Sequence, residues 1–194
     1  LDILCRHMGK QDHFAAAYGA FNVFTFNADE TVRVEPVYYD PDVVEALDES
    51  LMLFYMGTQR NASDVLRAQA KATAEKEPVL TAMQEMVDPM VEILSGHGDL
   101  ADVGPMLHES WLLKRSITDQ ISNDAIDHAY RKAMEAGSSG GKLVGAGGGG
   151  FLMLFVAPER QAAVSEALAG MSSICPGFDT AGSRITYYEP NRLT

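Results

Sequence analysis

The sequence has only two cysteines, and its longest apolar runs fall well short of the roughly 20 residues that span a bilayer. Cys5 and Cys175 lack the spacing of metal ligands, and two thiols in a chain of this length argue against a disulfide framework. We expect both thiols to be reduced and mostly buried. Residues 1–7 also lack the basic and apolar layout of a signal peptide, so the sequence predicts a cytoplasmic protein without a membrane partner.

Basic residues are scarce as well, with 15 lysines and arginines against 27 aspartates and glutamates and a net charge of −12. Nucleic acids and anionic membranes bind surfaces rich in basic groups, because those groups displace counterions. The charge balance therefore argues against both as partners. A small anionic substrate remains compatible with it, provided that a few basic groups converge locally.

Hydrophobic periodicity predicts an α+β fold, in which helices cover one face of a largely antiparallel sheet. Alternating apolar residues at 21–26 and 31–37, joined by a polar turn, predict a β-hairpin. A short helix is expected at 41–49, where proline occupies the first turn. The expected sheet strands lie at 50–56, near 143, at 151–156 and at 184–189, with a helix at 158–169.

Three apolar stripes at helical spacing predict core-facing helices between residues 63 and 134. Their members are Leu80, Met83, Val87, Met90 and Leu94 in the first stripe, Leu100, Val103, Leu107 and Trp111 in the second, and Ile126, Ala129, Tyr130, Ala133 and Met134 in the third. Pro89 should kink or divide the first helix, because proline removes a helical hydrogen bond. Ser122 or Asn123 is expected to cap the third helix, and Gly137 to end it.

A glycine run between two apolar segments is the first candidate for function. It comprises Gly145, Ala146, Gly147, Gly148, Gly149 and Gly150. Each glycine in a regular element costs roughly 0.5–1 kcal/mol relative to alanine, so the run indicates that a group such as a phosphate approaches the main chain closely. A Rossmann turn is excluded because the run precedes a strand, a Walker loop because Lys142 precedes the glycines, and a protein-kinase loop because the sequence has no His-Arg-Asp or Asp-Phe-Gly. A flexible hairpin connection is the structural alternative.

The second candidate is Asp12, which is expected at the start of an alanine-rich helix. The unpaired N–H groups and positive dipole end of the helix would keep its carboxylate ionised there, and a helix cap is the structural alternative. Lys10 and Gln11 favour a binding role, because a cation and an amide beside a carboxylate can bind a polyol and hold its hydroxyl against a base.

Two segments together resemble the GHMP small-molecule kinases. Residues 9–19 read Gly-Lys-Gln-Asp-His-Phe-Ala-Ala-Ala-Tyr-Gly, and residues 140–151 read Gly-Gly-Lys-Leu-Val-Gly-Ala-Gly-Gly-Gly-Gly-Phe. Residues 108–115, 121–123 and 126–127 fit a narrower group, the D-glycero-D-manno-heptose 7-phosphate kinases, so that the resemblance extends from about residue 6 to residue 188. The Gly-Lys-Gln-Asp stretch distinguishes this group from galactokinases and mevalonate kinases.

The resemblance implies a ferredoxin-like GHMP kinase C-terminal domain at 49–194, preceded at 1–48 by the end of the N-terminal domain with its catalytic helix and hairpin. It also implies transfer of the γ-phosphoryl group of ATP, with Mg²⁺, to the anomeric hydroxyl of D-glycero-D-manno-heptose 7-phosphate, which gives the 1,7-bisphosphate. Asp12 matches the family's catalytic aspartate, which acts as base or orienter for that hydroxyl. Residues 145–150 match the family's glycine loop beside the phosphates and the sugar.

Phosphoryl transfer needs cations around its crowded phosphates. The cationic candidates in this chain are Lys10, Arg60, Lys114, Arg115 and Lys142. We expect substrate-binding roles for Lys10, Lys114 and Lys142, together with Gln11, and a solvated surface position for Arg115. No metal site is expected, because the histidines are not spaced as ligands; they include His7, His13 and His108.

The chain departs from the family pattern in three places. Ala20 follows Gly19 where the family often has a second glycine, and Met56 precedes Gly57 where threonine is common; both changes affect the shape of the sugar pocket. The family's N-terminal motif and its Pro-x-x-x-Gly-Leu-Gly-Ser-Ser nucleotide loop have no counterpart in these 194 residues. We therefore expect that the main elements for ATP and Mg²⁺ lie in a missing N-terminal part, and that this chain is inactive alone.

Two alternatives stay open from the sequence. The first keeps the fold and changes the substrate to another sugar, such as fucose. The second is a non-catalytic binding or assembly module derived from the kinase, which forms a homodimer or pairs with a missing N-terminal half through exposed strands.

Overall fold

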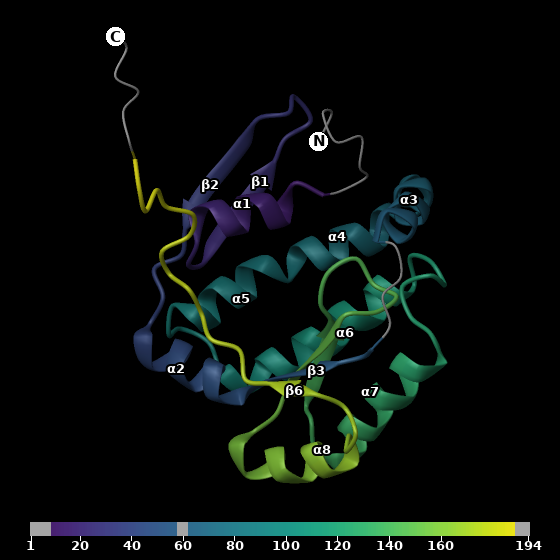
Figure 1. Cartoon of the computed structure of the whole chain (residues 1–194). Coiled ribbons are helices and arrows are strands. Elements are labelled where there is room, and N and C mark those ends of the chain that lie inside the picture. The colour runs from purple at the N-terminus through teal and green to yellow at the C-terminus, as the bar shows by residue number, and fades with distance from the viewer. Residues whose placement is uncertain (1–8, 58–61, 189–194) are drawn as a thin grey trace. The chain divides into compact units, whose positions relative to one another are not determined.

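The computed structural model describes residues 9–57 and 62–188 (Figure 1). These residues form two compact units, a larger one from residues 39–57 and 62–177 and a smaller one from residues 9–38 and 178–188. The larger unit includes the helix at residues 41–50. The domain division at residues 48 and 49 stays a prediction.

The larger unit contains a four-stranded sheet in the order β4-β5-β3-β6. Its strands are β3 (Leu51–Tyr55), β4 (Gly140–Leu143), β5 (Phe151–Phe155) and β6 (Ser173–Ile174), and each neighbouring pair is antiparallel. Helices separate β3 from β4 and β5 from β6, whereas β4 and β5 follow each other directly, as in a ferredoxin-like fold. The predicted α+β fold with an antiparallel sheet is confirmed.

The predicted last strand at 184–189 is wrong for residues 184–188, which form no strand; Glu189 lies outside the described residues. The edge of β3 is instead occupied by β6, which pairs with Leu53 and Phe54. Ile185 and Tyr187 are 81% and 78% exposed, as expected for residues outside a packed sheet.

The helices of the larger unit begin and end at local signals. They are α2 (Pro41–Ser50), α3 (Ala62–Ala72), α4 (Glu77–Glu85), α5 (Val87–Leu94), α6 (Val103–Arg115), α7 (Asp124–Ala136) and α8 (Gln161–Ala167), with short 3-10 helices at Thr73–Glu75, Leu100–Asp102 and Pro158–Arg160. The Asn123 side chain caps α7 by accepting hydrogen bonds from the first-turn N–H groups, and Gly137 ends this helix at a φ of 116°. Pro89 lies in the first turn of α5, and the chain divides between α4 and α5 as predicted.

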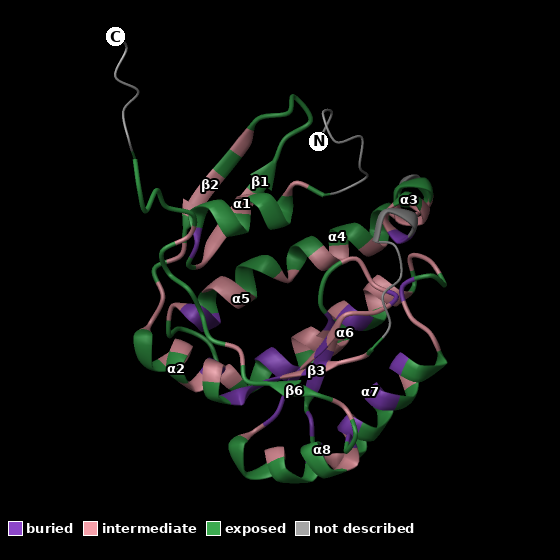
Figure 2. Cartoon of the chain, in the orientation of Figure 1, coloured by how far each residue is buried: buried purple, intermediate pink, exposed green. Residues whose placement is uncertain are grey.

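The core of the larger unit lies between the central strands and the helices of the second and third stripes (Figure 2). Trp111 of α6 and Ile126 of α7 are fully buried, as are Leu152 and Leu154 of β5. Burial of a side chain of this size contributes about 1.5–3 kcal/mol, so these contacts hold α6 and α7 on the sheet. The core position of Trp111 is confirmed.

The prediction that the first apolar stripe faces the core is wrong for the part of the stripe on α4. None of the α4 residues is buried (Figure 2). Leu80 of α4 and Val87 of α5 are exposed. Helix α4 packs mainly against α5 and α6. Of the first stripe, Leu94 at the end of α5 is buried.

The smaller unit consists of α1 (Gln11–Tyr18), the predicted hairpin and residues 178–188. The hairpin strands are β1 (Asn22–Phe26) and β2 (Val32–Pro36), so this prediction is confirmed. An aromatic cluster joins α1 to β1, with ring centroids 5.6 to 6.5 Å apart; its members are Phe14, Tyr18, Phe24 and Phe26. Residues 178–188 attach through the N–H of Ala20, which donates to the carbonyl of Asp179 at 3.0 Å.

The structure bears on two expectations drawn from composition, one about buried thiols and one about membrane-spanning segments. Cys175 is exposed, so the prediction of a buried thiol is wrong for this residue, because it follows the short edge strand β6 rather than a core strand. Cys5 lies outside the described residues. Among the helices of residues 9–57 and 62–188, none is long and apolar enough to cross a bilayer.

Candidate functional site

The glycine loop connects the antiparallel strands β4 and β5, so the predicted strand-loop-strand arrangement is confirmed. Gly147 adopts a φ of 113°, and a Cβ atom at this position would lie 3.0 Å from the Cα and the carbonyl oxygen of Ile121. Both the backbone conformation and the lack of space require glycine there. The loop is therefore packed against the segment between α6 and α7.

Three hydrogen bonds from different elements hold the loop. The N–H of Gly148 donates to the carbonyl of Ile121 at 2.8 Å. The side chain of Gln69 on α3 donates through Nε2 to the carbonyl of Ala146 at 2.8 Å. The Nζ of Lys114 on α6 donates to the carbonyl of Gly145. These contacts set the loop apart from the flexible hairpin connection that was the structural alternative.

Lys142 of β4 carries its charge in a partly buried position. Its Nζ donates to the hydroxyl of Ser110 on α6 at 3.1 Å, and burial lowers the pKa of the Lys142 ammonium. No carboxylate within residues 9–57 and 62–188 forms an ion pair with it. A partly buried cation without a carboxylate partner gains stability from a bound anion, so Lys142, on the strand that leads into the glycine loop, favours an anionic ligand.

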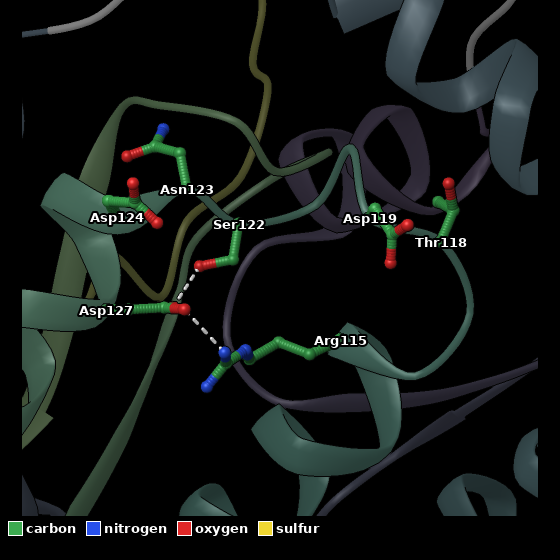
Figure 3. A pocket seen from close by; sticks show the side chains of 7 residues that line it. All are labelled: Arg115, Thr118, Asp119, Ser122, Asn123, Asp124 and Asp127. Atoms are coloured by element: carbon green, nitrogen blue, oxygen red, sulfur yellow. Dashed lines mark hydrogen bonds and ion pairs between the residues drawn. The ribbon is translucent and has the colours of Figure 1, made fainter.

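A polar pocket lies at the start of α7 (Figure 3). In it Arg115 and Ser122 both point toward Asp127, whose two carboxylate oxygens accept hydrogen bonds from them at 2.6 and 2.5 Å. The pocket is also lined by Asp119 and Asp124, so its lining contains three carboxylates and one guanidinium. This charge balance is unfavourable for a phosphate.

The expectation that Arg115 is a solvated surface charge is wrong. Its guanidinium forms the ion pair with Asp127 and lies 5.8 Å from the centre of the Trp111 ring, and about a third of the side chain is exposed. The pairing joins residues on α6 and α7 that are twelve positions apart in the sequence, which local charge patterns do not reveal.

The smaller unit contains the other candidates. Asp12 lies in the first turn of α1 and is exposed, and Lys10 occupies the N-cap position without a capping hydrogen bond. Asp12 therefore does not act as the cap, and within the described residues its carboxylate makes no hydrogen bond or ion pair. Lys10 donates to Glu30 in the hairpin turn, and this hydrogen bond lowers the pKa of Glu30. Gln11 is exposed beside Asp12.

The structure thus brings Lys114 to the glycine loop, whereas the Lys142 ammonium contacts Ser110 on α6. Lys10 and Gln11 directly precede Asp12 at the start of α1, and the Lys10 side chain pairs with Glu30. That the two sets act on one substrate stays a prediction. Arg60 and His7 lie outside the described residues. Over the residues that are described, no cluster of three or more histidine, cysteine, aspartate or glutamate side chains could hold a metal ion.

Sequence reasoning missed three residues that contact the loop or its lysine. They are Gln69, Ser110 and Ile121. Gln69 is 77 positions from its partner, and no local motif marks it. Ser110 and Ile121 fall within the segments that carried the family resemblance, which is the signal that could have found them.

Comparisons with known proteins agree with this arrangement. A family model described as GHMP kinases C terminal matches residues 70–173. The D-glycero-alpha-D-manno-heptose 7-phosphate kinase of Campylobacter jejuni is 29% identical over 162 residues, which cover 82% of this chain and 48% of that protein. The bifunctional fucokinase/GDP-fucose pyrophosphorylase of Arabidopsis thaliana is 27% identical over 135 residues, which cover 68% of this chain and 13% of that protein.

Solved structures give the same result for the fold. A D-glycero-D-manno-heptose 1-phosphate kinase from Bacteriodes thetaiotaomicron matches with a TM-score of 0.58 and 26% identity, over 90% of this chain and 47% of that one. A mevalonate kinase of L. major in complex with R-mevalonate matches with a TM-score of 0.63 over 86% of this chain and 52% of that one, and at 18% identity it shows the fold alone. The chain spans about half the length of the Campylobacter relative and of these two structures.

Proposed function

Because the chain belongs to the GHMP kinases, whose C-terminal family model matches residues 70–173, we propose that it supplies the C-terminal part of an ATP-dependent sugar kinase. The proposed reaction transfers the γ-phosphoryl group of ATP to the anomeric hydroxyl of D-glycero-D-manno-heptose 7-phosphate and gives the 1,7-bisphosphate. Similarity to the heptose 7-phosphate kinase of Campylobacter jejuni supports this substrate. The proposal places the protein in the cytoplasm, where ATP and sugar phosphates are found.

The observation that carries the proposal is the anchored glycine loop, together with a partly buried lysine on the strand that leads into it. The loop is held by Gln69 and Lys114, and Lys142 lies next to its start without an ion pair among the described residues. Backbone N–H groups and a poorly solvated cation stabilise the charge of a phosphoryl group during transfer, because they are in place before the reaction. We assign the phosphate side of the reaction to these residues.

Asp12 is assigned to the sugar side. Its exposed carboxylate lies in the first turn of α1, makes no hydrogen bond within the described residues, and is therefore available to a substrate hydroxyl. It would accept the proton of the anomeric hydroxyl or orient that hydroxyl for attack on the γ-phosphorus, and proton transfer of this kind contributes roughly 10²–10⁴-fold. The hydroxyl oxygen then bonds to phosphorus while the bond to the bridging oxygen of ADP breaks.

The proposal assigns the binding of Mg²⁺ and of the nucleotide base to residues outside this chain. Mg²⁺ is held in such enzymes by one or two carboxylates together with substrate phosphates. The described residues form no cluster of ligands for it, and the sequence lacks the family's Gly-Leu-Gly-Ser-Ser loop. We therefore derive no step through the metal and expect the elements that bind ATP and Mg²⁺ to come from an N-terminal part.

A fusion protein tests the proposal. The part of the Campylobacter jejuni heptose 7-phosphate kinase that precedes its match to this chain would be joined to residue 1, and ADP release would be measured with ATP and a panel of sugars. We expect turnover with heptose 7-phosphate, none with this chain alone, and none in the Asp12→Ala fusion. Turnover with fucose instead would support the alternative suggested by the Arabidopsis fucokinase. A folded fusion inactive on every sugar would contradict the proposal and favour a non-catalytic module.

A further inference from the structure

The hydrogen bonds of the glycine loop determine which of its N–H groups can bind an anion. The N–H of Gly148 is occupied by the carbonyl of Ile121. Within the described part of the chain, the N–H groups of Ala146 and Gly147 make no hydrogen bond. The φ angles of Gly145 and Gly147 are positive and that of Ala146 is not, and this alternation is typical of backbone that presents successive N–H groups to an anion.

The direction of each free N–H follows from the carbonyl in the same peptide plane. In a trans peptide the C=O and the N–H point in opposite directions. Gln69 holds the carbonyl of Ala146, so the N–H of Gly147 points away from Gln69. Lys114 holds the carbonyl of Gly145 and fixes the N–H of Ala146 in the same way.

From this geometry we propose that Gln69 is a positioning residue, which turns the N–H of Gly147 toward a phosphoryl oxygen by anchoring the carbonyl of Ala146. The inference rests on the proposed function of the loop and adds to it a residue outside every motif of the sequence. Without Gln69 the peptide plane that precedes the permissive residue Gly147 can rotate, and the N–H is no longer fixed before the anion arrives. Lys114 does the same for the preceding plane, so its ammonium acts on the backbone as well as through its charge.

Selective labelling isolates this one peptide plane. In a chain with ¹³C-carbonyl alanine and ¹⁵N glycine, a carbonyl–amide correlation spectrum contains one peak for each Ala-Gly pair, namely 136–137, 146–147, 169–170 and 181–182. The 146–147 peak reports both the Ala146 carbonyl that Gln69 holds and the Gly147 N–H that would donate a hydrogen bond to the anion. The three other peaks show whether the fold is intact.

The probe is inorganic phosphate, titrated into the 194-residue chain at fixed pH, with ionic strength held constant by sodium chloride. We expect the 146–147 peak to move with phosphate while the three others stay. In Gln69→Met, which removes the donor without adding charge, the Ala146 carbonyl should shift before phosphate is added. Phosphate should then bind about tenfold more weakly, as expected for the loss of one aligned hydrogen bond to a charged group. Gln84→Met, at an exposed position on α4, is the matched control and should behave like the unchanged chain.

Three other outcomes would contradict the positioning role of Gln69, the phosphate site, or both. If phosphate moves the 146–147 peak equally in Gln69→Met and in the unchanged chain, the positioning role is wrong and the phosphate site stands. If phosphate does not move this peak in the unchanged chain, both the phosphate site and the inference fail. If Gln69→Met moves all four peaks, Gln69 supports the fold as a whole and the inference is overturned. Gln69→Lys keeps an N–H donor and should restore the Ala146 carbonyl shift.

Discussion

Replacing Gly147 by alanine tests whether the glycine loop is docked on the segment between α6 and α7. An alanine at a φ of 113° is strained, and such strain costs about 1–3 kcal/mol. The new Cβ would also lie 3.0 Å from the Cα and carbonyl oxygen of Ile121, and overpacking of this kind costs about another 1–3 kcal/mol. Gly147→Ala should therefore destabilise the chain by about 2–6 kcal/mol.

Gly145→Ala is the matched control for this variant. Gly145 also has a positive φ, of 84°, but a Cβ there would meet nothing within 4 Å. The free energy of unfolding of Gly145→Ala should therefore fall only by the backbone strain, about 1–3 kcal/mol. The loss of unfolded-chain entropy is the same in both variants, so the difference between them reports the contact with Ile121.

Urea denaturation followed by tryptophan fluorescence measures this difference. The chain has one tryptophan, and Trp111 is fully buried in the larger unit, so its emission reports the unfolding of the unit that carries the loop. We expect the midpoint of Gly147→Ala to lie below that of Gly145→Ala, with similar m values. Equal midpoints would refute the docking of the loop on Ile121.

Three further predictions concern charged residues. Burial lowers the pKa of Lys142, so the unfolded chain binds more protons between that lowered pKa and the ordinary lysine value of 10.5, and stability rises with pH in this range. Lys142→Met should remove this rise in thermal melts, whereas Lys132→Met, at an exposed position, should keep it. Asp12→Asn in the fusion enzyme should lower kcat by about 10²–10⁴-fold with an unchanged circular dichroism spectrum, and wild-type turnover would remove the catalytic assignment. Asp127→Asn should lower the urea midpoint by the equivalent of only about 1 kcal/mol, because the pair with Arg115 is partly exposed, and a loss above 3 kcal/mol would show that the pair behaves as a buried one.

Most of the sheet and the helix ends could be predicted from the sequence. Short apolar runs between glycine and proline marked β3 and β5, and a capping residue and a glycine marked both ends of α7. These signals are local, since they depend on residues within one turn or strand. The first stripe failed over α4 because periodicity shows that a helix has an apolar face but not what covers that face.

The strand predicted at 184–189 failed for a similar reason. Alternation in this segment fits a strand, but a strand forms only where an edge is available to pair with it. That edge of β3 is occupied by β6, and residues 178–188 belong to the smaller unit. Pairing of distant segments depends on the whole fold, so a short stretch of sequence does not show which strand will pair with which edge.

The candidate site was predictable where a motif carried it. The glycine loop stood out because a run of glycines is costly, and the family motifs pointed to Lys142 and Asp12; the roles of these residues stay predictions. Gln69 did not, because an amide on a helix of ordinary composition is typical of a solvated surface. Its role depends on a single carbonyl 77 positions away.

The central claim is that Asp12 and the glycine loop act on the same transferred phosphoryl group. The most direct test is a crystal structure of the fusion enzyme with heptose 7-phosphate and a non-hydrolysable ATP analogue. We predict the anomeric oxygen within about 2.6–3.2 Å of the Asp12 carboxylate, with a γ-phosphate oxygen accepting a hydrogen bond from the N–H of Gly147. A structure in which the sugar is bound and the Asp12 carboxylate faces a different surface would contradict the claim.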